Sequence, residues 1–188
     1  MATVNFLLGI LCLAFTGSFA LFNRNMLIPP AVELNKEDTG QRNRLVEIAA
    51  HELGTREKTR QNDGLKVEAY LACVQLQKGQ PYCAAFVSWV YAREGLPEPR
   101  SGWSPALFPA SRLTRAAAPG NVLGIYFAAL KRIAHVGLIM RQDGEWVTSI
   151  EANTNVSGSR EGDGVYKKRR HLKTIYRIAD WVKGREKQ

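Results

Sequence analysis

The spacing of apolar residues changes about two thirds of the way along this chain. In the first part, apolar positions recur every three or four residues, which is the period of a helix that buries one face. Residues 86, 87, 90 and 91 show this spacing most clearly, and Gly95 follows them as a stop signal. The pattern predicts helices over residues 41 to about 54, 65–74 and 83–95.

Beyond residue 120 the apolar positions alternate with polar ones or form short runs, as in strands. The predicted strands cover residues 121–127, 135–140 and 145–153, with shorter ones at 165–166 and 175–176. Residues 97–119 are rich in Pro and Ser and are predicted to form a loop with short turns. Helices followed by a meandering antiparallel sheet indicate an α+β fold, with the N-terminal helices packed on the sheet.

Residues 1–22 are interpreted as a signal peptide or a membrane anchor, because residues 6–22 within them are almost wholly apolar. Ser18-Phe19-Ala20 offers a cleavage site of small residues, whereas the first Arg, Arg24, comes only after the segment. Residues 23–40 contain Pro29-Pro30 and mixed charge, and are interpreted as a linker. The remaining stretch, 41–184, is long enough for one domain with its own core. Export to the cell envelope or periplasm, or anchoring by residues 6–22, is the expected localisation.

The composition favours a folded, basic protein. Of its 188 residues, 45% are hydrophobic. The chain contains 26 Lys and Arg residues and 17 Asp and Glu residues, which gives a formal net charge of +9. Such a surface suits a polyanionic partner. No motif of a specific nucleic-acid reader is present, and the basic run 167–170 is interpreted as a solvated loop or strand edge. Three cysteines give neither a disulfide scaffold nor a metal-ligand spacing, so no metal or other cofactor is expected.

Cys83 is the candidate nucleophile. It opens the third predicted helix, where unpaired N–H groups and the positive end of the helix dipole favour a thiolate. A cysteine enzyme also needs a base, usually an imidazole. His51 lies in the first helix and His171 follows the basic run, whereas His135 begins a predicted strand and is the candidate base.

The hairpin that follows His135 supplies two candidates for holding its ring. Glu151 and Asn153 lie on one face of the returning strand, together with Ser149. A two-residue turn at Asp143-Gly144 would point them to the wrong side, because a slip of one residue exchanges the two faces. We therefore predict a three-residue loop or an equivalent bulge, with Gly144 in a left-handed conformation. In that register His135 faces Asn153 and Gly137 faces Glu151, and the missing Gly137 side chain leaves room beside His135 for Glu151 or for substrate.

These motifs, in this order, resemble the CHAP group of the NlpC-like, papain-type cysteine amidases. The resemblance covers roughly residues 45–177 and rests on Gln80-Pro81-Tyr82-Cys83-Ala84-Ala85-Phe86-Val87-Ser88-Trp89, Ala134-His135-Val136-Gly137 and Glu151-Ala152-Asn153-Thr154-Asn155, with Asn62-Asp63-Gly64 upstream. It implies a papain-like fold, a Cys83 nucleophile, a His135 base and an orienting Glu151 or Asn153. The Cys83 N–H would form part of the oxyanion hole.

Two residues are the candidates for substrate binding. Tyr82 stands immediately before the nucleophile, where some relatives carry a Gln as oxyanion donor, so the second donor remains open. Trp103 lies in the Pro- and Ser-rich stretch and either lines a groove for sugar or peptide or anchors its loop.

The resemblance implies a peptidoglycan amidase or endopeptidase that works through an acyl-enzyme, with the anionic wall polymer as partner. Three alternatives stay open from the sequence. The first is another cysteine acyl-transfer enzyme on the same scaffold, such as an effector, an acyltransferase or a deamidase. The second is a non-catalytic module that binds the cell wall. The third is a binder of nucleic acid or anionic lipid that depends on net charge alone.

Overall fold

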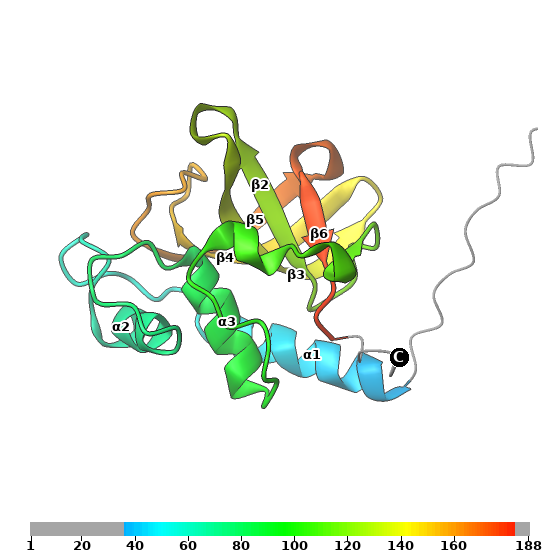
Figure 1. Ribbon diagram of the computed structural model, residues 1–188, viewed down its shortest axis with the longest axis horizontal. Coiled ribbons are helices and arrows are strands. Elements are labelled where there is room, and N and C mark those ends of the chain that lie inside the picture. Colours follow the sequence, from blue (N-terminus) through cyan, green and yellow to red (C-terminus); the bar gives the residue numbers. More distant parts are fainter. Residues whose placement is uncertain (1–35, 183–188) are drawn as a thin grey trace, which may run out of the picture. The chain divides into compact units, whose positions relative to one another are not determined.

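The computed structural model describes residues 36–182 (Figure 1). The predicted signal or anchor segment, 1–22, and most of the predicted linker lie outside these residues. Within them, no helix is long and apolar enough to cross a membrane.

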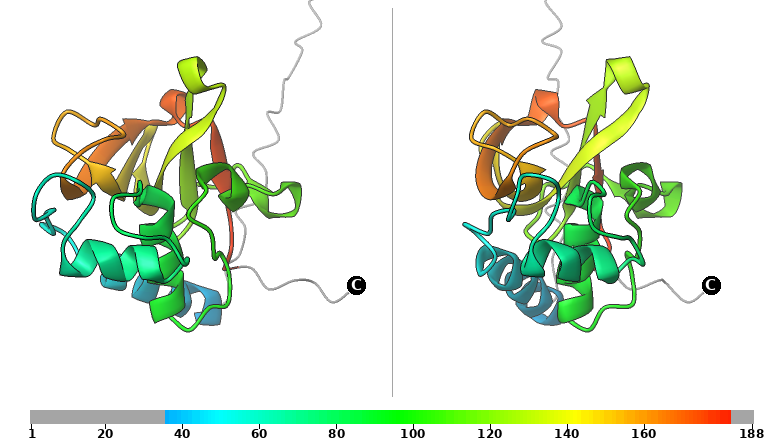
Figure 2. Two further views of the ribbon diagram at one scale, coloured as in Figure 1. Left: turned by 60° about the vertical axis from the view of Figure 1, so that its left-hand side comes forward. Right: turned by 90° about the vertical axis from the view of Figure 1, so that its left-hand side faces the viewer.

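The described residues form an α+β fold of three α-helices and one six-stranded antiparallel sheet. The strands are ordered β1-β6-β2-β3-β4-β5. Figures 1 and 2 show the three helices gathered on one side of the sheet. The helices are α1 (Lys36–Ala50), α2 (Leu65–Ala72) and α3 (Cys83–Arg93), and the strands are β1 (Leu113–Thr114), β2 (Val122–Phe127), β3 (Arg132–Asp143), β4 (Trp146–Thr154), β5 (Gly164–His171) and β6 (Arg177–Ala179).

The predicted helices are all present, and the main boundary error concerns the first. Helix α1 begins at Lys36, inside the stretch predicted as linker, and ends at Ala50. Two acidic residues in its first turn, Glu37 and Asp38, interact favourably with the positive end of the helix dipole. They stabilise a helical turn that precedes the first apolar position of the predicted helix. The chain then turns through residues 51–54, where Gly54 has a φ of 87°.

Strand boundaries were predicted less well at the C-terminal end. Strand β5 runs to His171, beyond the predicted residues 165–166, and therefore includes the whole basic run, which was interpreted as a solvated loop or strand edge. Strand β6 begins at Arg177, after the predicted residues 175–176. Strand β1 was not predicted, because a strand of two residues leaves no alternation to detect.

Helix α3 is the centre of the main core. Eight of its eleven residues are buried, and it packs against the sheet along β3. Alternate residues of β2, β3 and β4 enter this core or a smaller cluster on the other face. Ile150 and Ala152 of β4 face the helices, whereas Val147 belongs to the smaller cluster.

The register between β3 and β4 confirms the predicted slip. The turn itself is Gly144-Glu145, with Asp143 paired to Trp146. An extra residue at Met140 then shifts the pairing, so that Ile139 lies opposite Ser149 and Leu138 opposite Ile150. The predicted equivalent bulge is therefore realised at Met140, and Gly144 has the expected positive φ, 56°.

One buried ion pair joins α1 to the C-terminal strand region. Arg42, only 1% exposed, bonds to Asp180 Oδ2 at 2.7 Å and to Asn121 Oδ1 at 2.7 Å. A further bond, at 3.2 Å, reaches the carbonyl of Pro119. These contacts fix the helix against residues far away in the sequence.

We expect Arg42→Met to destabilise the protein by about 3–5 kcal/mol, because it removes a buried cation from the Asp180 carboxylate and a hydrogen-bond donor from Asn121. Urea unfolding followed by circular dichroism would measure the change. Arg44→Met is the matched control: Arg44 is mostly exposed and pairs with Glu94, so its loss should change the stability by less than about 1 kcal/mol. Equal losses in the two variants would contradict the proposed importance of the Arg42 contacts.

Candidate active site

Cys83 is the first residue of α3 and is almost completely buried. The side chain of Tyr82, at the N-cap position, makes no capping hydrogen bond. The first N–H groups of a helix have no partner within it, so they offer positive charge close to the sulfur. The Cys83 Sγ also lies 3.5 Å from the hydroxyl oxygen of Ser104, at the start of the short 3₁₀ helix Ser104–Leu107.

His135 of β3 lies beside the nucleophile. Its ring is 1% exposed, and Nε2 is 2.8 Å from Glu151 Oε2. Its other nitrogen, Nδ1, makes no hydrogen bond to the described residues in this geometry. The imidazole and the Cys83 thiol nonetheless interact closely enough for each to shift the pKa of the other. Nδ1 is therefore the nitrogen free to exchange a proton with the sulfur.

Glu151 is completely buried and is the acceptor of several hydrogen bonds. Ser149 donates its hydroxyl to Oε1 at 2.7 Å. Arg170 donates from Nε to Oε1 at 2.9 Å and from Nη2 to Oε2 at 2.5 Å. With His135 on Oε2, both carboxylate oxygens are fully engaged, and the carboxylate is held in one orientation.

Gly137 provides the space for this carboxylate. A Cβ atom at position 137 would lie 2.5 Å from Glu151 Cγ and 3.1 Å from the Ile150 carbonyl oxygen. Of the two predicted occupants of the space beside Gly137, Glu151 or substrate, the Glu151 side chain is the one found there.

The pKa values follow from these contacts. Burial alone would raise the pKa of the Cys83 thiol, but His135, Ser104 and the backbone of Val136 together bring it below its usual value. Burial would lower the pKa of His135, yet Cys83 and Glu151 raise it to about 9. Burial would likewise raise the pKa of Glu151, and Arg170 and His135 instead hold it well below its usual range. All three shifts favour the charged forms, a thiolate, an imidazolium and a carboxylate.

Asn153, the other predicted orienting residue, bonds elsewhere. It is buried and has a positive φ of 57°. Its Oδ1 accepts the Tyr82 backbone N–H at 3.4 Å, and its Nδ2 donates to the Arg160 carbonyl at 2.7 Å. Of the two candidates, Glu151 is the one that meets the His135 ring, while Asn153 connects the start of α3 with the loop after β4.

Tyr82 has no exposed side-chain surface. Its hydroxyl donates to Glu57 at 3.1 Å, within the main core region near α2. Its position differs from that expected of a substrate-binding side chain, although its backbone lies directly before Cys83.

Arg170 and Ser104 were not identified from the sequence. Arg170 belongs to the basic run interpreted as a solvated strand edge, but on β5 alternate members of that run point to opposite sides. Lys167 and Arg169 are exposed, whereas Arg170 reaches Glu151 and Lys168 bonds to the carbonyls of residues 155 and 156. Because side chains alternate along a strand, an interpretation of residues 167–170 as strand would have placed Lys168 and Arg170 on one side and Lys167 and Arg169 on the other.

A cavity of about 420 Å³ opens over Cys83. Trp103, predicted as a groove residue, lines it and is 54% exposed. The guanidinium of Arg132 stacks on the Trp103 ring, 4.2 Å from its centroid. The complete lining is Leu76, Gln80, Pro81, Cys83, Ser101, Gly102, Trp103, Ser104, Arg132, Ala134 and Arg160.

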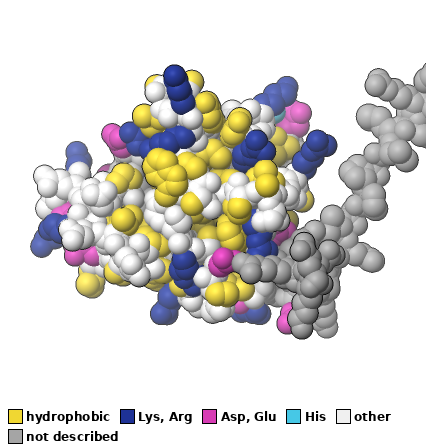
Figure 3. All heavy atoms as spheres, in the orientation of Figure 1, with side chains coloured by type: hydrophobic (Ala, Val, Ile, Leu, Met, Phe, Trp, Pro, Cys, Tyr) yellow, Lys and Arg dark blue, Asp and Glu magenta, His cyan; other side chains and the backbone are white. Residues whose placement is uncertain are grey.

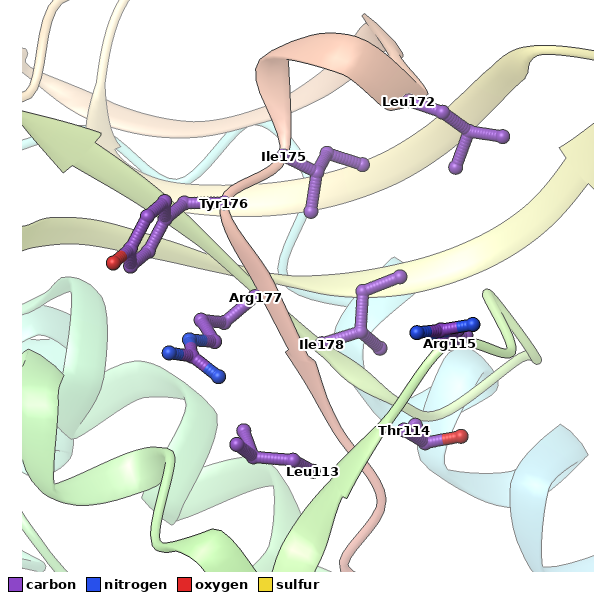
Figure 4. Close-up of a pocket in the computed structure, with 8 residues that line it drawn as sticks. All are labelled: Leu113, Thr114, Arg115, Leu172, Ile175, Tyr176, Arg177 and Ile178. Carbon is purple, nitrogen blue, oxygen red and sulfur yellow. The ribbon is translucent and has the colours of Figure 1, made fainter.

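A second hollow, of about 660 Å³, lies between β1, β6 and the turn before β6 (Figure 4). It is larger, but its lining contains no Cys, His or carboxylate that could act as nucleophile or base. The residues that line it are Leu113, Thr114, Arg115, Leu172, Ile175, Tyr176, Arg177 and Ile178. The cavity over Cys83 is therefore the candidate reaction centre. In residues 36–182, no group of three or more His, Cys, Asp or Glu side chains could hold a metal ion.

Alkylation of Cys83 by iodoacetamide should follow its thiolate fraction and reach half its maximum below pH 8.5, the approximate pKa of an ordinary thiol. In His135→Ala, burial still raises the thiol pKa but the imidazole no longer lowers it. The midpoint should therefore move up by at least about one pH unit, with a roughly tenfold slower reaction at pH 7. Mass spectrometry of the peptide that contains Cys83 measures the rate. His171→Ala, which removes a histidine outside the site, should leave the midpoint unchanged, and an unchanged midpoint in His135→Ala would refute the pairing.

Arg170→Met should destabilise the protein by about 2–4 kcal/mol at pH 7, because Glu151 stays buried with less compensation. Glu151 has a lower pKa folded than unfolded, so its contribution is present above about pH 4.5 and is lost as the pH falls further. Without Arg170 that pKa is less depressed, so the stability gap to the wild type should stay constant from pH 7 to about pH 4.5 and narrow as the pH falls further, through the folded pKa of the variant. Urea unfolding at several pH values tests this. Lys167→Met, on the exposed face of the same strand, should change stability by less than about 0.5 kcal/mol. A difference in stability between Arg170→Met and the wild type that does not depend on pH would contradict the role given to Arg170.

Comparison of the chain with family models, with curated proteins and with solved structures found no match.

Proposed function

We propose that this protein is a cysteine-dependent hydrolase that cleaves amide bonds of peptidoglycan through an acyl-enzyme. The observation that supports this most strongly is the buried series Cys83, His135 and Glu151, in which the carboxylate fixes one nitrogen of the ring and leaves the other for the thiol. The proposal includes a papain-like fold of the CHAP type, with the nucleophile at the start of a helix and the base on a strand.

The proposed reaction begins with an ion pair. His135 holds the proton of Cys83, and the thiolate attacks the carbonyl carbon of the scissile amide. The resulting oxyanion accepts the Cys83 backbone N–H, which has no partner within its helix. The imidazolium then gives its proton to the leaving amine as the C–N bond breaks. Water, deprotonated by His135, hydrolyses the thioester and restores the thiol.

Glu151 serves this cycle by orientation and charge. Its bond to Nε2 keeps Nδ1 directed to the sulfur, and its negative charge stabilises the imidazolium that forms. Acid–base assistance by a positioned side chain is worth roughly 100- to 10,000-fold in rate.

Peptidoglycan is the proposed substrate for three reasons. The order of the three motifs resembles that of wall-cleaving cysteine amidases. The net charge of +9 suits an anionic polymer. The predicted export or anchor segment would bring the domain to the cell envelope. Trp103 is exposed at the cavity and offers an aromatic surface for a sugar ring or a peptide.

Cys83→Ala should abolish the release of soluble fragments from purified cell walls while the thermal unfolding temperature stays within a few degrees of the wild type. Mass spectrometry of the digest would identify the bond that is cut. Cys73→Ala is the matched control, since Cys73 is a free cysteine outside the cavity, and it should retain full activity. Full wall digestion by Cys83→Ala would exclude the proposed mechanism, and no release by the folded wild type would exclude the proposed substrate.

A further inference from the structure

The cavity over Cys83 is positively charged. The only charged side chains among those that line it, apart from a thiolate at Cys83 itself, are the guanidiniums of Arg132 and Arg160. A substrate entering the cavity therefore meets two cations and a thiolate whose own charge repels anions.

The guanidinium of Arg132 is fixed in position but keeps N–H donors for a ligand. Its guanidinium stacks on Trp103 and donates one N–H, from Nη1, to the Ile133 carbonyl at 3.1 Å. These contacts fix its position but use one of its five N–H donors. No carboxylate within residues 36–182 forms an ion pair with it at 4.0 Å or less.

Arg160 has a partner that a ligand can replace. Its guanidinium pairs with Glu161, whose side chain is 67% exposed. An ion pair so open to solvent contributes little free energy. The backbone of Arg160 is better fixed, because its carbonyl accepts the Asn153 amide and Asn153 in turn accepts the N–H of Tyr82. The loop that carries Arg160 is thereby connected to the residue before the nucleophile.

We propose that the substrate of Cys83 carries a free carboxylate close to the scissile amide, and that Arg132 and Arg160 bind this carboxylate. This inference rests on the proposed hydrolase function and specifies the class of peptide that the site takes. Guanidiniums bind carboxylates through paired N–H donors, so the two arginines would both offset the repulsion by the thiolate and position the neighbouring amide. The carboxylate is either that of an acidic side chain or a terminal one.

Two alkylating reagents test the anion site without any substrate. Iodoacetate and iodoacetamide react alike, since Cys83 Sγ forms a bond to carbon while the carbon–iodine bond breaks and iodide leaves. Only iodoacetate carries a carboxylate next to the reacting carbon. The ratio of the two rates at Cys83, measured by mass spectrometry on the full chain, therefore reports the attraction of a carboxylate to the cavity.

Arg132→Gln and Arg160→Gln should each lower the ratio of iodoacetate to iodoacetamide reactivity by about three- to tenfold. The iodoacetamide rate itself should change little, which also shows that the site remains folded. Arg115→Gln is the matched control, because it removes an arginine that lines the hollow of Figure 4 instead. A ratio that is equal in the wild type and all three variants would overturn the inference, as would failure of Cys83 to react with either reagent.

Matched peptides then test the substrate class. Each pair should differ only in a carboxylate or a carboxamide beside the scissile bond, with one pair altered at a side chain and another at the C-terminus. We expect the wild type to cleave the carboxylate form of one pair with at least about tenfold higher kcat/KM, and Arg132→Gln and Arg160→Gln to remove that preference through KM. The pair that shows the preference identifies the source of the carboxylate.

The two tests separate the inference from the proposed function. Loss of iodoacetate selectivity in the arginine variants without cleavage of any peptide or wall would leave the anion site standing and refute the hydrolase. Cleavage of carboxylate and carboxamide peptides at equal rates, with an unchanged alkylation ratio, would leave the hydrolase standing and refute the anion site.

Discussion

The structure around Cys83 depends on one buried charge, the carboxylate of Glu151. Removing a carboxylate from water costs several kcal/mol unless cations and hydrogen-bond donors replace the solvent. Here Ser149, Arg170 and His135 supply them. The ring of His135 is consequently both positioned and charged by a group that has no contact with solvent, and the shift of the Cys83 pKa follows from that ring.

Several backbone features have a common explanation in this requirement. Glu151 enters the interior only because the bulge at Met140 sets the register, and because Gly137 has no side chain to occupy the space. Its main cation comes from β5, the edge strand of the sheet, where alternate residues face inward. The bulge and the glycine lie on β3 and the arginine lies on β5, and each is needed for the same carboxylate to be buried.

The parts of the site that the sequence predicted are those governed by local pattern. Helical periodicity after Cys83 identified α3, and the alternation of β4 placed Glu151 and Ser149 on one face. The register prediction succeeded because a slip of one residue exchanges buried and exposed faces, so only one register suits the polar residues. Alternation could have separated Arg170 from the exposed members of the basic run, but its pairing with Glu151 depends on the alignment of two strands that no local rule determines. Ser104 lies in a loop whose path to Cys83 is likewise set by tertiary packing.

Asn153 shows why two polar residues on the same face need not share a role. Both Glu151 and Asn153 were candidates for holding His135, and period-two alternation alone treats them as equivalent. At Asn153, however, the backbone adopts a left-handed conformation, which asparagine tolerates better than most residues. The pairing of β4 with β5 shifts its register here, between Glu151 and Thr154, and the Asn153 side-chain amide bonds to the backbone of Tyr82 and Arg160 instead. An amide can join a donor and an acceptor in this manner, whereas a carboxylate can only accept. The chemical difference between the two side chains thus assigns one to the imidazole and the other to the connection between nucleophile and cavity wall.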